Sequence, residues 1–96
     1  MLPFYHLSIF FQRVAQEPSL NPTHISLYIA LFQLWTINNF RNPVSISRQE
    51  VMEISKIASR VTYHKCIKKL QLLGFIDYKP SYNPFKNSQI YIVIFQ

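Results

Sequence analysis

Half of the positive charge of this sequence lies in one stretch, KIASRVTYHKCIKKLQLLG, at residues 56–74. Five of the ten Lys and Arg residues fall between Lys56 and Lys69, and none of the four acidic residues does. In a helix that begins at Ser59, one face carries Arg60, Val61, His64, Lys65 and Lys68, with Lys69 on its flank. A strip of cations attracts phosphates, and such a helix can lie in the major groove of DNA, where base edges are within reach. The alternative is a solvated surface helix that is basic and has no partner.

The opposite face of the same helix is apolar. It carries Tyr63, Cys66, Ile67, Leu70 and Leu73 at helical spacing, which predicts that this face packs on a core. Because Cys66 lies on that face, it is expected to be a small buried hydrophobe and not a nucleophile. A single cysteine also excludes an internal disulfide and every cysteine-based zinc site. Its presence as a free thiol suits a reducing cytoplasm.

Little else in the chain has the residue types for catalysis. The acidic residues are Glu17, Glu50, Glu53 and Asp77. They leave little material for acid–base catalysis, and no strand-turn-helix nucleophile elbow brings Ser, His and Asp together. The single Gly argues against a glycine-rich phosphate loop. His6 and His24 fall on different helices without a Cys partner, so we expect no metal site, no cofactor and no enzyme activity.

Four helices are expected to position the basic strip. Apolar spacing predicts helices over residues 3–16, 22–38, 47–55 and 59–73. Asn21 can cap the second helix with Pro22 at its first position, and that helix is expected to be the core helix, with Trp35 inside. Ser47 and Glu50 form the pattern of a reciprocal capping box at the start of the third. Gly74 stands where the last helix needs a residue with positive φ.

After Gly74 the period becomes that of strands. Residues 75–79 and 89–95 predict a two-stranded hairpin over 75–95, joined by a polar loop at 80–88, and residues 44–46 could add one very short strand. The aromatic residues Phe75, Tyr78 and Tyr91 on these strands could stack on bases, but filling a core is the favoured interpretation. The fold class is therefore α+β, mainly helical, in a single domain over residues 1–96.

The segments SRQEVMEIS, TYHKCIKKLQLLGFIDY and the hairpin beyond them resemble the winged helix-turn-helix domain of bacterial regulators. The resemblance covers roughly residues 22–95. It implies a winged helix-turn-helix with an extra N-terminal helix and a C-terminal β-hairpin wing, similar to small single-domain proteins of bacterial chromosomes and mobile elements. In this family the second helix of the pair enters the major groove. Two departures are expected, namely a turn between the helices about two residues longer than the tight form and a wing whose only cations are Lys79 and Lys86.

The resemblance also implies a set of DNA-binding residues. On the helix pair these are Lys56, Ser59, Arg60, Val61, His64, Lys65, Lys68 and Lys69. On the wing, Tyr82, Asn83, Lys86 and Asn87 would reach phosphates or the adjacent minor groove. The implied function is sequence-specific binding of double-stranded DNA by a bacterial transcriptional regulator. Two alternatives stay open: a winged-helix protein-interaction module, and a replication accessory that binds DNA without sequence preference.

The composition of the chain limits which classes of partner are expected. The net charge of +6 and the pI near 9.7 favour a polyanionic partner, with nucleic acid more fitting than a membrane surface. No run approaches the roughly 20 apolar residues of a membrane span, and the start lacks the cationic region and cleavage site of a signal peptide. The expected location is therefore the cytoplasm, with no small-molecule ligand indicated.

The N-terminal helix carries more apolar residues than the core from Pro22 onward requires. Its stripe consists of Phe4, Leu7, Phe10, Phe11 and Val14. An apolar stripe of this width is not normally left in water. It is expected to form the interface of a homodimer, and the alternative is that it folds back on the core helix of its own chain.

Overall fold

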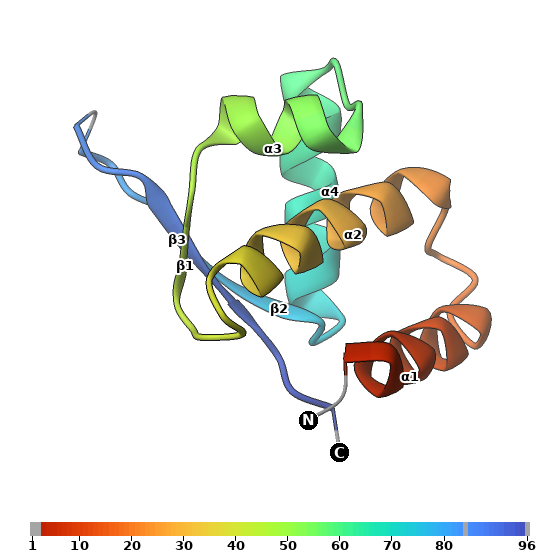
Figure 1. Cartoon of the computed structure of the whole chain (residues 1–96). Helices are drawn as coiled ribbons and strands as arrows, with labels where there is room; N and C mark the ends of the chain where they lie inside the picture. The colour runs from red at the N-terminus through yellow and green to blue at the C-terminus, as the bar shows by residue number, and fades with distance from the viewer. Residues whose placement is uncertain (1–2, 84, 96) are drawn as a thin grey trace.

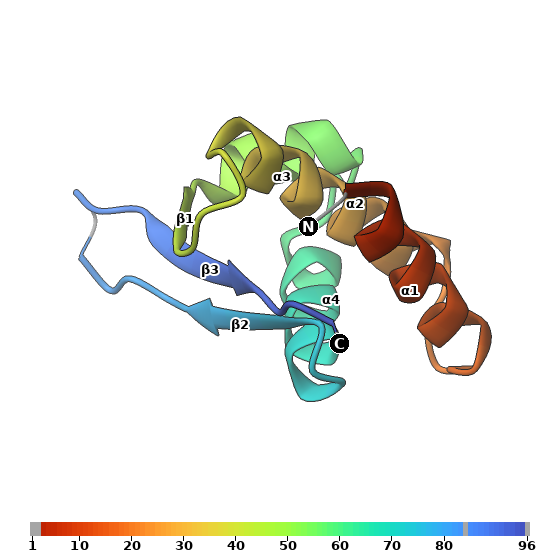
Figure 2. The ribbon, with the colours of Figure 1, turned by 60° about the horizontal axis from the view of Figure 1, so that its bottom comes forward.

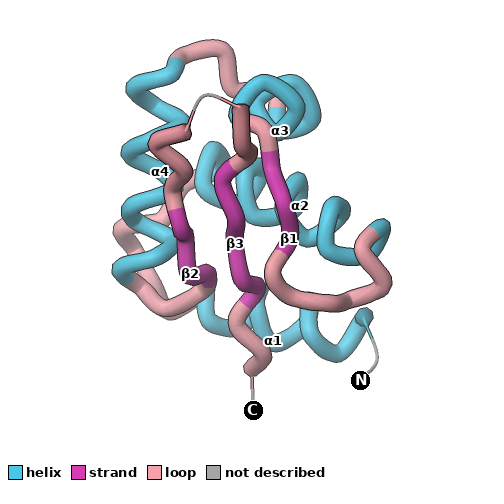
Figure 3. Tube along the Cα trace, turned by 90° about the vertical axis from the view of Figure 1, so that its left-hand side faces the viewer, coloured by secondary structure: helices cyan, strands magenta, loops and turns pink. Residues whose placement is uncertain are grey.

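The computed structural model describes residues 3–83 and 85–95. This part of the chain forms four helices and a three-stranded antiparallel sheet, so the expected α+β, mainly helical class is confirmed (Figure 1). The sheet is one layer, and the helices cover one of its faces (Figure 3). No helix within the described ranges is long and apolar enough to cross a membrane.

The sheet has the order β1-β3-β2. Its strands are β1 (Val44–Ile46), β2 (Ile76–Lys79) and β3 (Ser88–Ile92). Val44 is opposite Ile90, and Ile76 is opposite Ile92. The hairpin expected over 75–95 is thus present with shorter strands, but it does not stand alone, because β1 pairs with the outer edge of β3. Alternate side chains of β1 and β3 point into the core, as the two-residue period of a half-buried strand requires.

The first two helices are α1 (Pro3–Ala15) and α2 (Pro22–Ile37). Asn21 caps α2 as expected, since its side-chain oxygen accepts the backbone N–H groups of Thr23 at 2.9 Å and His24 at 3.3 Å. The His24 ring completes a capping box, because its Nδ1 accepts the Asn21 N–H at 3.0 Å. This reciprocal bond was not expected, because the usual residue at the third position is Glu or Gln.

The next two helices are α3 (Arg48–Ser55) and α4 (Arg60–Leu72). Ser47 caps α3 by accepting the Glu50 N–H at 3.1 Å. Within the described residues the Glu50 side chain does not return the second bond, so the capping box expected here is only half formed. Residues 56–59 connect the two helices, and Lys56 ends α3 in the left-handed conformation with φ 63°. This connection of four residues is at the upper end of the usual range for such a helix pair.

The end of α4 follows the expectation for Gly74. Its φ is +83°, the left-handed region that suits glycine. The Gly74 N–H donates to the Gln71 carbonyl at 3.0 Å, and the Phe75 N–H donates to the Leu70 carbonyl at 2.9 Å. These two bonds form a Schellman motif, which ends the helix and turns the chain into β2.

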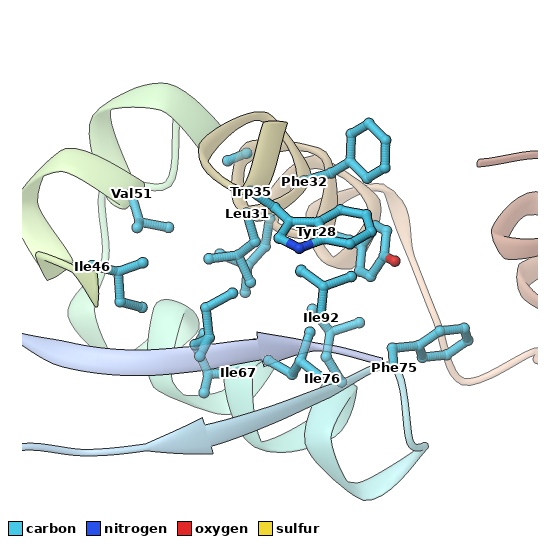
Figure 4. Packing of buried hydrophobic residues seen from close by; sticks show 14 of the residues in the cluster. Tyr28, Leu31, Phe32, Trp35, Ile46, Val51, Ile67, Phe75, Ile76 and Ile92 are labelled. Carbon is cyan, nitrogen blue, oxygen red and sulfur yellow. The ribbon is translucent and has the colours of Figure 1, made fainter. Parts of the chain in front are cut away.

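The core lies between α2, α4 and the inner face of the sheet (Figure 4). Trp35, Leu31 and Tyr28 of α2 point toward Ile92 and Ile76 of the sheet and Ile67 of α4 (Figure 4). Trp35 is fully buried, which confirms the core position expected for it. The central place of α2 follows from its composition, because a helix that is apolar almost all round is stable only when it is covered on several sides.

The N-terminal helix α1 packs on this core through rings. Phe10 is fully buried and stacks on Tyr28 with 3.8 Å between ring centroids. Leu7 and Val14 are partly buried against the core, whereas Phe4 and Phe11 stay exposed. Phe10 therefore folds back on the core helix of its own chain, as the alternative had it, and is not available to a partner. Phe4 and Phe11 remain candidates for a dimer interface.

Candidate nucleic-acid interface

Helix α4 separates its side chains into two faces. Tyr63, Cys66, Ile67 and Leu70 are buried, and Leu73 just after the helix is half-buried. This buried face packs against α2 and β2. The burial of this apolar face was predicted from the spacing of its residues and is confirmed.

The exposed face carries the basic strip. Arg60, Val61, His64, Lys65 and Lys68 are all exposed. Arg60, His64 and Lys68 are four residues apart, so they form one row along the helix. Among the described residues no carboxylate lies within ion-pair distance of these cations. The ion pair that the described residues do form joins Lys79 and Asp77 on β2 at 3.3 Å. The strip is therefore an uncompensated line of positive charge.

Two predicted members of the interface have other surroundings. Lys69 is half-buried, on the flank of the strip. Burial chiefly, and the charge of Lys69 next, lower the pKa of His24 at the start of α2. Ser59 accepts the Thr62 N–H at 3.2 Å and so caps α4. Its contribution is to define where the basic helix begins.

An open cavity of about 540 Å³ lies between α3 and the beginning of α4. Arg48, Lys56 and Arg60 line it together with the apolar side chains of Met52 and Ile57. The acid in its wall is Glu53, whose carboxylate accepts from the Gln49 amide at 3.3 Å. Arg48 was not among the predicted residues, because it precedes the basic stretch by a whole helix. Its position directly after the Ser47 cap, like that of Arg60 after Ser59, was the available signal.

The hairpin of β2 and β3 extends beyond the body of the molecule, away from α4 (Figures 1 and 2). Lys86 and Asn87 are exposed near its end, as are Tyr82 and Asn83. The predicted residues thus form two separate regions: one on α4 and the α3–α4 turn, and one on the hairpin.

The Cys66 thiol and the Tyr63 phenol, two further reactive groups, are buried. Burial raises the pKa of the Cys66 thiol, so it stays protonated at neutral pH, whereas a nucleophilic cysteine needs a thiolate. Burial is also the main reason that the pKa of Tyr63 rises to about 12. Over residues 3–83 and 85–95, no three His, Cys, Asp or Glu side chains gather where they could hold a metal ion.

Comparison of the chain with protein-family models, with curated proteins and with solved structures found no match. The residues and their geometry are therefore the basis for a functional proposal.

Proposed function

We propose that this protein binds double-stranded DNA without catalysing a reaction, and that it belongs to the winged helix-turn-helix class of transcriptional regulators. One observation carries the proposal. Helix α4 has a fully packed apolar face and, opposite it, an exposed line of cations with no carboxylate of the described residues within ion-pair distance. A rigid cationic helix of this kind suits the major groove, where phosphates supply affinity and base edges supply discrimination.

The order of the elements supports the assignment to this class. A core helix, a short strand, two helices joined by a short turn and two further strands follow one another, and the first strand pairs with the last. In this assignment α3 and α4 are the helix-turn-helix, the β2–β3 hairpin is the wing, and α1 is an addition.

The residues divide by role. Arg60 at the start of α4 is proposed to contact base edges, because N-terminal residues of a recognition helix reach furthest into the groove. Lys65 and Lys68 along the strip, with Arg48 and Lys56 at the α3–α4 cavity, are proposed to contact phosphates. Phosphate contacts fix the orientation on the duplex and carry no direct sequence information.

The proposal is tested by fluorescence anisotropy with random duplex DNA over a salt series. Neutralising about four to seven phosphates gives a log–log salt slope of roughly −4 to −6. Lys68→Gln should lower the magnitude of that slope by about 1. Arg41→Gln is the matched control, because Arg41 is an exposed cation in the turn between α2 and β1 and should leave the slope unchanged.

Undetectable binding of the intact chain at ~50 mM salt, where electrostatic attraction is strong, contradicts the proposal. Selection of bound duplexes from a random pool then distinguishes a regulator from a replication accessory. A regulator enriches a defined site, whereas an accessory without base readout enriches none.

A protein-interaction module is the second candidate, and one observation favours it. Phe4 and Tyr5 of α1 are exposed to 86% and 65%, although His6 and Phe10 of the same helix are buried. Exposed rings of this size on a folded helix are typical of surfaces that contact another protein. In this alternative α1 would be the working surface and the basic strip would be solvated.

A further inference from the structure

The end of the hairpin carries two aromatic rings that contact little of the protein. Tyr82 is 92% exposed and Phe85 is 93% exposed. By contrast, Phe75 and Phe95 of the sheet region are buried. Single exposed aromatics are common on protein surfaces, but two at the end of one projecting hairpin (Figure 2) call for a partner that covers them.

Hydrogen bonds hold the backbone that presents these rings. The Ser81 N–H donates to Ser88 Oγ at 3.1 Å, which ties the two sides of the loop together. The Asn83 N–H donates to Ser81 Oγ at 3.2 Å, and the Phe85 N–H donates to Asn83 Oδ1 at 2.9 Å. A backbone that is already ordered loses less conformational entropy when it binds. Residues 81–83 and the Phe85 N–H thus belong to a hydrogen-bonded part of the loop.

The charge around the rings identifies the kind of partner. Lys86 lies next to Phe85, Lys79 at the end of β2 pairs with Asp77 at 3.3 Å, and no acidic residue follows Asp77 in the chain. An apolar end with cations beside it matches a polyanion whose interior is apolar. Duplex DNA has this character, because stacked bases lie behind the phosphates. Two rings and two lysines are a small anchor for a lipid surface, where stable attachment takes larger apolar insertions.

We propose that the hairpin end enters the minor groove and that Phe85, supported by Tyr82, inserts between two base pairs and kinks the duplex. This inference rests on the proposed function. Apolar side chains that insert from the minor groove unstack a base step and bend the DNA toward the major groove. The preferred sites contain pyrimidine–purine steps, which unstack most easily. The hairpin thus selects DNA by its deformability, while α4 reads base edges.

The test uses the intact chain and three measurements on one duplex. Anisotropy gives affinity, energy transfer between dyes at the duplex ends gives bending, and 2-aminopurine at a TA step reports unstacking. The intact chain should bend the duplex and brighten the 2-aminopurine. Phe85→Ala should lose both signals and bind roughly 5- to 100-fold more weakly, the range for loss of one aromatic–base stack. Phe85→Leu should restore part of the bend, because leucine also serves as a wedge.

Two controls isolate the wedge. Ile37→Ala removes another exposed apolar side chain, at the end of α2, and should change none of the three signals. Lys86→Gln should weaken binding but keep the bend. Circular dichroism melts verify that each variant is folded, which the exposure of these side chains leads us to expect.

The outcomes separate this inference from the proposed function. Binding of duplex without bending or unstacking, or with both retained in Phe85→Ala, overturns the wedge and leaves the proposed function standing. Failure of the intact chain to bind any duplex overturns both. Binding to vesicles of anionic lipid that Phe85→Ala abolishes, with duplex binding unaffected, shows that the hairpin end serves a membrane and also overturns the wedge.

Discussion

The His6 imidazole of α1 is buried among aromatic rings, with only 1% of its surface exposed. Its Nε2 lies 2.6 Å from the Tyr28 hydroxyl, a hydrogen bond between α1 and α2. The Phe95 ring stacks on it at 4.7 Å between centroids. Burial lowers the pKa of His6 below its ordinary value of 6.5, because a charged imidazole loses its hydration there. The neutral ring is thus the form that α1 requires.

This environment predicts acid sensitivity. Because the pKa of His6 is lower in the folded protein than in the unfolded chain, the unfolded chain binds more protons as the pH falls below about 6.5. The free energy of unfolding should therefore have its full value above that pH and decrease below it. Urea unfolding at pH 7.5 and at pH 5 measures the difference.

The matched variant is His6→Phe, which keeps the ring and removes the titrating group. It should lose about 1–3 kcal/mol at pH 7.5, since the Tyr28 hydroxyl is left without its partner, but it should lose less on acidification. His24, whose pKa is also lowered, chiefly by burial, remains in both proteins and accounts for the rest of the pH dependence. An equal loss on acidification in both proteins would show that His6 is not the sensor.

Two cations test the separation of readout from positioning. Arg60→Ala, which removes the proposed base contact, should cost ~1–3 kcal/mol on the true site and flatten discrimination there. Lys86→Ala should weaken all sequences alike and lower the salt slope by about 1. Anisotropy with the selected site and with a scrambled duplex measures both effects. Similar, sequence-independent losses in the two variants would assign Arg60 to phosphate positioning.

At the scale of the elements, the end of α4 depends on one backbone conformation. No atom lies within 4 Å of the position that a Gly74 side chain would occupy, so a substitution meets strain and no clash. At φ +83°, Gly74→Ala should cost about 1–2 kcal/mol in the free energy of unfolding. Gly74→Asn should cost less, because Asn tolerates the left-handed region. Chemical denaturation of the three proteins checks the order, and an Ala variant as stable as the parent would contradict it.

The two faces of α4 and the cap positions at Asn21, Ser47 and Ser59 could be predicted from the sequence. Each follows from local rules, namely the helical period and a short polar side chain before an apolar run. The pairing of β1 with β3 could not, because it joins segments more than forty residues apart and β1 has only three residues. The same limit explains the site: spacing revealed the strip on α4 but not Arg48, which reaches the α3–α4 cavity only through tertiary packing.

The place of His6 was missed for a related reason. Its neighbours are Tyr28 of α2 and Phe95 near the other end of the chain, and an apolar stripe predicts that a helix is covered without telling what covers it. The same ambiguity left open whether the stripe of α1 faces its own chain or a second one. In the structure, Phe10 of this stripe is buried in its own chain, whereas Phe4 and Phe11 are exposed.

At the scale of the whole molecule, the outer part of that stripe still favours a homodimer. Phe4 and Phe11 are exposed, and together with Leu7 and Val14, which are partly buried against the core, they have the alternating three- and four-residue spacing of a helix–helix seam. The one Lys or Arg of α1, Arg13, lies over the Phe95 ring at 4.6 Å from its centroid and so is directed toward its own chain. Two copies of α1 can therefore pair about a two-fold axis without bringing like charges together.

Sedimentation velocity tests the dimer. The intact chain should sediment as a dimer at roughly 50 µM, and Phe4→Glu/Phe11→Glu should sediment as a folded monomer, because association depends on concentration and on the uncharged seam. Ile37→Glu is the control, since Ile37 is an exposed apolar residue at the end of α2, outside the seam. A folded monomer of the intact chain at this concentration would rule out the dimer.

The stacking of His6 on Phe95 has a consequence for how the protein is made. These residues lie almost a whole chain apart, yet their rings touch. On a ribosome, α1 emerges first but lacks this contact until residue 95 has emerged, while α3, its turn and α4 need only near neighbours. Until then α1 is held by contacts with α2, such as the stacking of Phe10 on Tyr28, and its packing is incomplete. The side of α1 that Phe95 covers stays open to other molecules during translation, so growing chains should be most prone to associate through α1 before residue 95 is released.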